Sequence, residues 1–197
     1  MSKGETTRAA ILDVALATAS RIGLEALSIG ELAKEAGLSK SGLFAHFASK
    51  EQLQLEVVRK AIEKFIEVVI SPALKKPRGE PRVRALFENW FEWGRASELP
   101  GGCLFIAASS EFDDQPGPVR DLLLSSQKDW LSVLAQAARV AVEEGHFQPK
   151  LDTEQFAWQL DSFILGYHHS ARLFRSKDAS KRAHEAFESL IRASRAS

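Results

Sequence analysis

Apolar residues recur along most of the chain at the spacing of an α-helix. Near the N-terminus they lie three or four positions apart, on one helix face: Ile11, Leu12, Ala15, Leu16, Ala19 and Ile22. Gly23 follows them as a helix stop. No run of β-branched residues alternates with polar ones, as a half-buried strand would require. The pattern therefore predicts an all-α fold.

Three helix starts follow in close succession. Ser28 and Glu31 form a capping box, in which the two side chains satisfy free backbone N–H groups at the start of a helix. Ser39 caps the next helix, and Ser49 begins a third. The third helix carries an apolar stripe until Pro72: Leu53, Val57, Val58, Ala61, Ile62, Phe65 and Val69. The first two helices are too short to be stable alone, so packing must hold them.

A polar connector rich in proline and glycine spans 75–81. Beyond it the pattern predicts five further helices, near 82–98, 103–113, 117–144, 152–174 and 178–195. The chain is thus expected to contain about nine helices in two domains. The predicted boundaries are 5–65 for a three-helix N-terminal domain and 66–197 for a larger C-terminal one.

Composition is that of an ordinary globular protein, with 45% hydrophobic and 26% charged residues. No apolar run is long enough to cross a membrane, and the polar N-terminus lacks the apolar stretch of a secretory signal. With Cys103 as the single cysteine, these features predict a cytoplasmic protein. The 26 basic and 26 acidic residues cancel, so the basic excess typical of nucleic-acid binding is missing. DNA binding must therefore rest on a local arrangement.

Two short helices joined at Gly37 have the form of a helix-turn-helix, predicted at 28–47. Gly37 tolerates the left-handed backbone of a tight turn, and Ala33 and Ala36 are small enough for the helices to approach closely. The second helix begins with short polar side chains, one cation and a glycine, in the order Ser39, Lys40, Ser41 and Gly42. Such a first turn suits insertion into the major groove of DNA.

The stretch from 27 to 53 resembles the DNA-binding signature of the TetR family almost from end to end. The matching positions are Ser28, Ala36, Gly37, Ser39, Leu43, Phe44, His46, Phe47, Lys50 and Leu53. The match covers roughly the first third of the chain, and the remainder agrees in length and helical character. The resemblance implies a DNA-binding N-terminal domain and a C-terminal domain that binds a small ligand and forms a homodimer.

The residues expected to contact DNA are Ser28, Ser39, Lys40, Ser41, Gly42, Phe44, His46 and Lys50. Members of the family usually have tyrosine where this chain has Phe44, and that hydroxyl is expected to touch a phosphate. Phe44 cannot donate a hydrogen bond. Its ring would instead pack along sugar edges, or binding would depend more on His46 and Lys50. Without the motif, the lysines would be ordinary solvated side chains and the histidine a structural one.

The C-terminal part is rich in large apolar side chains, most of which must be core. Collectively they allow an apolar cavity between helices, which is the usual setting of a ligand site and one that the resemblance implies. The predicted lining is Phe65, Phe87, Trp90, Phe91, Phe105, Ser109, Phe112, Gln127, Trp130, Phe163 and His168. Ser109, Gln127 and His168 are its candidate polar groups.

The last two predicted helices are the expected dimer surface. Their apolar stripes contain Phe156, Leu160, Phe163, Ile164, Tyr167, Ala171, Ala183, Phe187, Leu190 and Ile191. Two copies of this helix pair would form a four-helix bundle. The alternative is that the stripes pack only inside their own subunit.

Other chemistry finds little support in the sequence. Cys103 at a helix start is either a thiol sensor or, more in keeping with the habits of cysteine, a small core residue. The adjacent His168 and His169 point to different helix faces, which makes a poor metal site. No catalytic motif stands out, and neither a cofactor nor a metal is expected.

The leading hypothesis is therefore a ligand-responsive transcriptional regulator. It would be a repressor that binds a palindromic operator as a homodimer and is released by a small apolar or amphipathic effector. The alternative is a small-molecule-binding helical protein with a vestigial helix-turn-helix. An enzyme is a remote third interpretation.

Overall fold

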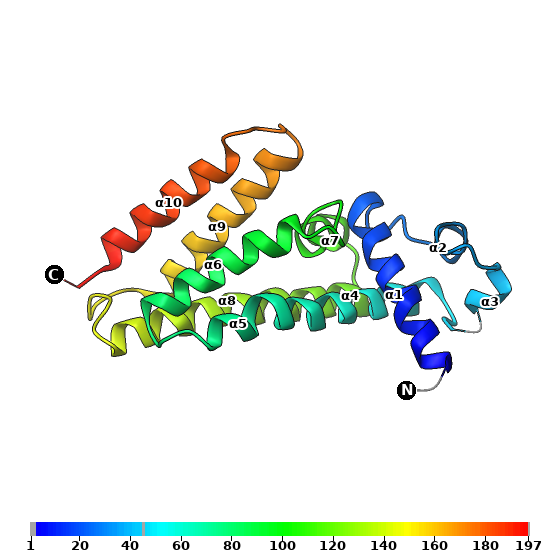
Figure 1. Ribbon diagram of the computed structural model, residues 1–197, viewed down its shortest axis with the longest axis horizontal. Coiled ribbons are helices and arrows are strands. Elements are labelled where there is room, and N and C mark those ends of the chain that lie inside the picture. Colours follow the sequence, from blue (N-terminus) through cyan, green and yellow to red (C-terminus); the bar gives the residue numbers. More distant parts are fainter. Residues whose placement is uncertain (1–2, 45, 197) are drawn as a thin grey trace. The chain divides into compact units, whose positions relative to one another are not determined.

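The computed structural model describes residues 3–44 and 46–196, and the chain forms two compact units. Unit 1 consists of Met1–Phe65 and Trp93–Ser126, and unit 2 of Ile66–Glu92 and Gln127–Ser197. The all-α prediction is confirmed (Figure 1). Ala45 of the predicted motif and Ser197 at the predicted chain end lie outside the described residues. The predicted domain boundaries, 5–65 and 66–197, stay a prediction, because 93–126 belongs to the unit that contains the N-terminal helices.

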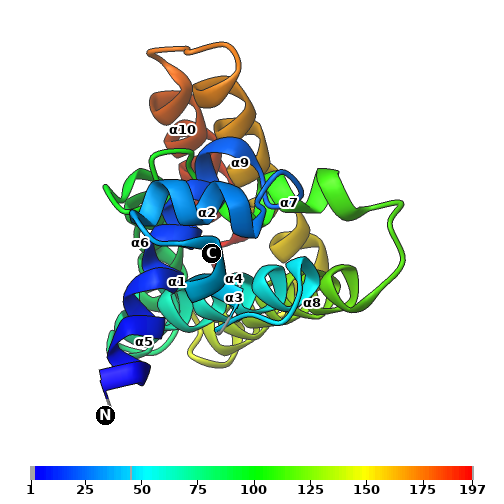
Figure 2. The same cartoon turned by 90° about the vertical axis from the view of Figure 1, so that its right-hand side faces the viewer.

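Unit 1 is built around its first helix. The helices α1 (Lys3–Ile22), α2 (Ile29–Ala36), α3 (Lys40–Phe44) and α4 (Lys50–Phe65) follow in chain order. α1 lies against α2, α4 and α7 (Leu104–Phe112), and α2 lies against α3 (Figures 1 and 2). The short α2 and α3 thus depend on α1 and on each other, as their length requires.

The predicted caps of these helices are present. The Ser28 hydroxyl accepts a hydrogen bond from the backbone N–H of Glu31 at 3.1 Å. Gly37 ends α2 in the left-handed conformation, with φ of 64°, and the N–H of Leu38 bonds to the carbonyl of Ala33 at 2.9 Å. An L side chain at Gly37 would be strained, so the turn between α2 and α3 requires glycine.

Unit 2 contains the π-helical turn η1 (Ile66–Ile70), α5 (Ser71–Leu74), α9 (Thr153–Arg172) and α10 (Ala179–Ser194). It also contains most of α6 (Glu80–Arg95) and of α8 (Pro118–Glu143). The last two helices form an antiparallel pair (Figure 1). The indole N–H of Trp130 on α8 donates to Asp161 on α9 at 3.1 Å.

The predicted uninterrupted helix from Ser49 to Pro72 is wrong in one respect, because its end is π-helical. Pro72 has no N–H for the carbonyl four residues earlier, and its ring would clash with that carbonyl in an α-helix. The regular helix therefore does not continue through Pro72, which lies instead in the first turn of α5, where proline is tolerated. The carbonyl of Val69 within the π-helical turn accepts a hydrogen bond from the Asn89 amide at 2.9 Å, so α6 braces the irregular turn.

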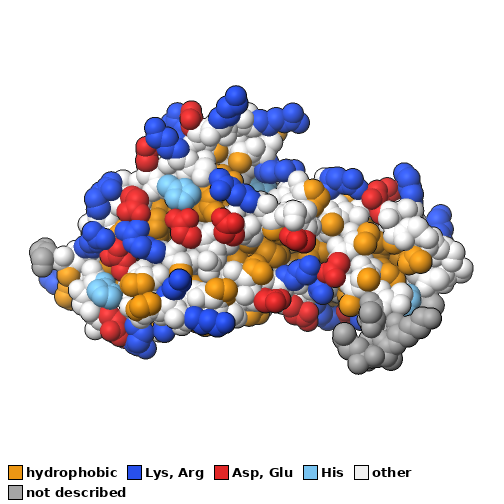
Figure 3. Space-filling model, in the orientation of Figure 1, with side chains coloured by type: hydrophobic (Ala, Val, Ile, Leu, Met, Phe, Trp, Pro, Cys, Tyr) orange, Lys and Arg blue, Asp and Glu red, His pale blue; other side chains and the backbone are white. Residues whose placement is uncertain are grey.

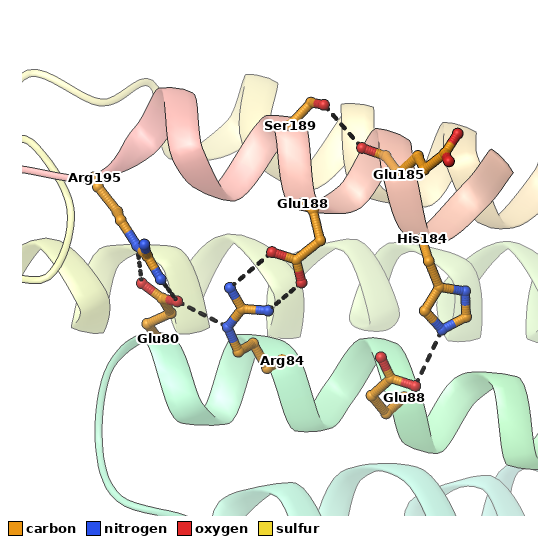
Figure 4. A network of polar contacts seen from close by, with 8 residues as sticks. All are labelled: Glu80, Arg84, Glu88, His184, Glu185, Glu188, Ser189 and Arg195. Carbon is orange, nitrogen blue, oxygen red and sulfur yellow. Dashed lines mark hydrogen bonds and ion pairs between the residues drawn. The ribbon is translucent and has the colours of Figure 1, made fainter. Parts of the chain in front are cut away.

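Aromatic stacking and ion pairs join α6 to α10. Phe87 and Phe187 are stacked with ring centroids 3.9 Å apart, and both are buried. Beside them, Glu80 accepts hydrogen bonds from Arg84 at 2.8 Å and from Arg195 at 2.7 and 2.9 Å (Figure 4). Arg84 also pairs with both carboxylate oxygens of Glu188 on α10. The network fixes the end of the chain to the start of α6.

Acid should weaken this network. Hydrogen bonds from Arg195 and Arg84 lower the pKa of Glu80 from 4.5 to about 2. A lowered pKa means that the folded state is stabilised at pH values above the ordinary pKa of the carboxyl group. This stabilisation is lost as pH falls from about 4.5 to about 2. We expect Glu80→Gln to lower Tm by about 2–4 °C at neutral pH, the shift that about 1 kcal/mol gives at this size. Between these two pH values, the Tm of the variant should also fall less than the Tm of the wild type.

Thermal unfolding followed by circular dichroism at several pH values measures both effects. Glu185→Gln, which changes an exposed carboxylate on α10, is the matched control. Equal acid sensitivity of the wild type and Glu80→Gln would show that the network contributes nothing to stability.

Candidate nucleic-acid interface

The start of α3 presents a polar surface. Ser39, Lys40, Ser41 and Gly42 are all exposed, while Leu43 is fully buried. Phe44, the residue that departs from the family's usual tyrosine, is 56% exposed. A large aromatic side chain that is exposed beside a polar row is available to a partner. It contributes little to the core of its own unit.

Local hydrogen bonds order this surface. The Ser39 hydroxyl accepts from the N–H of Gly42 at 3.1 Å, as an N-cap does, and lies 3.2 Å from the Ser41 hydroxyl. A Cβ at position 42 would fall 3.1 Å from the Ser39 oxygen, so glycine leaves room for the cap. The helix is only five residues long. The N–H groups of His46 and Phe47 bond to the carbonyl of Leu43 and close one more turn.

Ser28 and Lys40 lie close together. A Cβ on Gly30 would be 3.2 Å from Cε of Lys40, 3.5 Å from its ammonium nitrogen and 3.8 Å from the Ser28 hydroxyl. The N-cap hydroxyl of α2 and a cation of α3 thus border the same space beside Gly30. Hydroxyl groups and lysines are the side chains that position a protein on a DNA phosphate.

Lys50 already has a partner. Its ammonium group lies 2.9 Å from a carboxylate oxygen of Glu25, in the turn between α1 and α2. The hydrogen bond from Lys50 lowers the pKa of Glu25. Both side chains are close to half exposed, so the pair is accessible to solvent. Glu25 was not predicted, because no local pattern connects residues that are far apart in the chain.

His46 completes the predicted DNA-binding set. It is partly exposed, and its ring lies 6.4 Å from that of the buried Phe47. On the face drawn in Figure 3, acidic and basic side chains are interspersed, in keeping with the zero net charge. The candidate interface is thus a local feature of α2, α3 and the start of α4.

The predicted ligand-lining residues fall into one group in each unit. In unit 1, Phe65 contacts Phe105 at 5.7 Å between ring centroids, and Trp93 at 5.5 Å. On the same helix as Phe105, the Ser109 hydroxyl donates to a backbone carbonyl of its own helix, and Phe112 borders a hollow. Phe65, Phe105 and Phe112 are buried, and Ser109 is partly exposed.

In unit 2, Phe87, Trp90 and Phe91 form an aromatic cluster with Tyr167 and His184. Gln127 and Phe163 are partly exposed, and Trp130 is buried. The Nε2 atom of His168 is buried without a hydrogen-bond partner, and burial lowers the pKa of this histidine. Whether these residues contact a ligand stays a prediction.

A groove of about 470 Å³ lies elsewhere in unit 2, between η1, α5, α6 and α8. Its walls are formed by Ile70, Ala73, Leu74, Arg82, Leu86, Asp129, Ser132, Val133, Gln136, Ala137 and Val140. The volume lies within the range of small-molecule sites. None of the predicted ligand residues borders it, because the prediction selected aromatic side chains and these aromatics fill the core.

The dimer surface expected from the sequence stays a prediction, and its residues differ in exposure. Six of them are buried within the subunit: Phe156, Leu160, Ile164, Ala183, Phe187 and Ile191. Phe163, Tyr167, Ala171 and Leu190 are partly exposed. The large exposed apolar side chains of α9 are instead Trp158, at 62%, and Leu165, at 44%, followed by Leu173 and Phe174 beyond the helix. Apolar periodicity indicates a buried stripe but does not tell which neighbour covers it.

Cys103 is buried directly before α7, which favours the core interpretation. Among residues 3–44 and 46–196, no three His, Cys, Asp or Glu side chains gather in a way that could hold a metal ion. None of the helices in the described part of the chain is both long enough and apolar enough to cross a membrane.

Comparison with known families agrees with this geometry. A family model described as "Bacterial regulatory proteins, tetR family" matches residues 11–57. A second, described as "Tetracyclin repressor-like, C-terminal domain", matches residues 79–187. The first contains the helix-turn-helix, and the second covers more than half of the chain.

Individual proteins give the same result. The HTH-type transcriptional repressor KstR2 of Mycobacterium tuberculosis is 28% identical over 153 residues, which are 75% of this chain and 72% of KstR2. A TetR transcriptional regulator from Chloroflexus aurantiacus has a similar fold, with a TM-score of 0.85 at 23% identity over 97% of this chain and 95% of that one. AibR, solved with isovaleryl coenzyme A and operator DNA, has a TM-score of 0.67 at 23% identity over 82% and 85%.

The fold and the exposed α3 define a helix-turn-helix DNA-binding protein. The chain belongs to the TetR family. It is a DNA-binding transcriptional regulator of the ligand-responsive TetR type, and the family and the relatives described above are regulators and not enzymes.

Proposed function

We propose that the protein is a cytoplasmic, homodimeric repressor that binds a palindromic operator and is released by a small apolar or amphipathic molecule. The observation that carries the proposal is the exposed polar turn of α3, with Lys40 and Ser41 free of the core. A helix of this kind contacts base edges in the major groove. KstR2 is a transcriptional repressor, which supports repression as the mode of regulation.

A homodimer follows from the demands of DNA binding. A single helix-turn-helix contacts too little DNA for high specificity, so such proteins pair two of them on half-sites one helical turn apart. Trp158 and Leu165 are seven residues apart and lie on one exposed face of α9. Exposed apolar side chains that share a helix face are typical of protein–protein contacts. We infer that this face, and not the buried stripe, pairs with a second copy.

The groove in unit 2 is proposed as the effector site. Its apolar walls suit an apolar body, while Arg82, Asp129 and Ser132 supply polar groups at its edge. One wall, formed by η1 and α5, continues directly from α4, the helix that begins at Lys50. AibR, which was solved with a small molecule and operator DNA, supports an effector-controlled equilibrium between DNA-bound and released states.

DNA binding is tested by selection from random duplex DNA followed by gel-shift assay. We expect enrichment of a palindrome. Lys40→Ala and Ser41→Ala should relax preference at particular positions by about 1–3 kcal/mol, the range for a good base contact. Phe44→Tyr should tighten binding by about 1 kcal/mol through a restored phosphate hydrogen bond.

Lys181→Ala on α10, which also removes an exposed cation, is the control and should leave the selected sequence unchanged. If the wild type enriches no sequence, the protein is instead a small-molecule binder with a vestigial helix-turn-helix.

Assembly is tested by the double variant Trp158→Glu, Leu165→Glu. Charged groups in an apolar interface would oppose pairing, so monomers by sedimentation and loss of operator binding are expected, with helical content kept. Val68→Glu, at another apolar position that is 45% exposed, should remain dimeric. Phe187→Glu is unsuitable, because Phe187 is stacked inside the subunit. A double variant that stays dimeric would place the interface elsewhere.

The groove is tested with the amphipathic dye 8-anilinonaphthalene-1-sulfonate. Ala137→Trp should fill the groove and weaken dye binding by about tenfold, which corresponds to 1.4 kcal/mol. Ala193→Trp, on the exposed side of α10, should bind dye as the wild type does. Equal fluorescence titrations for the wild type and Ala137→Trp would show that the groove is not the site.

A further inference from the structure

The carboxylate of Glu111, on α7, lies in the turn between α1 and α2. One of its oxygens accepts a hydrogen bond from the backbone N–H of Glu25 at 2.8 Å. The other lies where a side chain at position 23 would be, because a Cβ on Gly23 would fall 2.2 Å from it. Gly23 has φ of 94°, so both its conformation and its lack of a side chain admit this carboxylate. Glu111 therefore fixes the backbone of Glu25.

The side chain of Glu25 extends from this fixed backbone to the start of α4. Its two oxygens lie 2.9 Å from the ammonium group of Lys50 and 3.4 Å from the amide nitrogen of Gln54. The same amide nitrogen donates to the buried carbonyl of Leu24 at 3.0 Å. A continuous series of contacts thus leads from α7 through Glu25 to Lys50, and all of it lies within unit 1.

We propose that Glu25 holds Lys50 in place of a DNA phosphate, and that Glu111 is the positioning residue through which α7 controls this contact. The inference rests on the proposed function, since it assumes that Lys50 contacts DNA. In the structure the ammonium group is neutralised by a carboxylate of its own chain. DNA binding requires Lys50 to exchange this carboxylate for a phosphate.

The exchange is energetically easy. The pair is exposed to solvent, where an ion pair contributes little and salt screens it. A phosphate contact additionally releases a counterion from the DNA. A carboxylate near the phosphate backbone also repels it, so Glu25 opposes DNA binding twice. A small change in the position of Glu25 is enough to shift the balance.

The surroundings allow such a change. A hollow of about 310 Å³ borders Glu25, Lys50, Gln54, Phe112 and Arg120, which leaves room for the lysine to move. Phe112 follows Glu111 directly and is buried. A displacement of α7 that moves Phe112 must also move the Glu111 carboxylate, which would loosen or tighten the hold on Glu25.

The experiment measures affinity for a labelled random-sequence duplex of about 30 base pairs, long enough for two half-sites, as a function of salt. Phosphate contacts do not depend on sequence, so no operator is needed. Glu25→Gln should tighten binding about twofold to fivefold, the change that an exposed ion pair makes. Glu35→Gln removes the same charge from another exposed ion pair of unit 1, with Arg21, and should change affinity less.

The Lys50→Ala background provides the decisive comparison. Lys50→Ala alone should weaken binding and lower the salt slope by about one phosphate contact. In that background, most of the gain from Glu25→Gln should disappear. Glu111→Ala should tighten binding, as Glu25→Gln does, and only when Lys50 is present. Glu111→Gln, whose amide oxygen still accepts from the Glu25 N–H, should behave as the wild type.

Two results overturn the inference alone. One is that the wild type binds the duplex but Glu25→Gln raises the affinity no more than Glu35→Gln does. The other is a gain that persists undiminished without Lys50. Since Glu25→Gln leaves the packing of α7 intact, the test stands even where Glu111→Ala fails to fold. A wild type that binds no duplex overturns the proposed function, and this inference with it.

Discussion

A helix of five residues keeps its shape only through the side chains that it buries. In α3 and the turn after it these are Leu43 and Phe47, both with no solvent exposure. The guanidinium group of Arg8 on α1 lies over the Phe47 ring at 5.3 Å. Because Leu43 and Phe47 supply the packing, the side chains of Lys40, Ser41 and Phe44 stay exposed. The candidate DNA-binding surface is available because the core uses so few residues of α3.

The order of the helices could be predicted from the sequence because the positions of helix ends depend on local chemistry. Caps and stops act within one turn, so Ser28, Gly37 and Ser39 place helix ends almost independently of the rest of the chain. The exposed row on α3 was likewise predictable, since the family signature fixes which positions are core. The π-helical turn was not predicted, although Pro72 indicated the end of the regular helix.

Contacts between residues far apart in the chain could not be predicted from the sequence, for a physical reason. An apolar stripe on α9 or α10 has the same periodicity whether a helix of the same subunit or a second subunit covers it. Phe156 and Phe187 lie on such stripes, and both are buried within the subunit. The same holds for the Glu25–Lys50 pair, whose members meet only because α1, α2 and α4 pack together. Aromatic content pointed to a ligand cavity, but the groove in unit 2 is lined by aliphatic and polar side chains, none of them aromatic.

The π-helical turn also affects how the side chains that line this groove can change. A turn of this kind arises where a helix accommodates one residue more than regular geometry allows, and each residue of an α-helix rotates the chain by about 100°. Gain or loss of that single residue would change which side chains of α5 face the groove, while the caps and neighbours of α4 stay as they are. Ile70, Ala73 and Leu74 all belong to this wall. A one-codon insertion or deletion would thus renew part of the groove lining in a single step and leave the sequence of the helices before it unaltered.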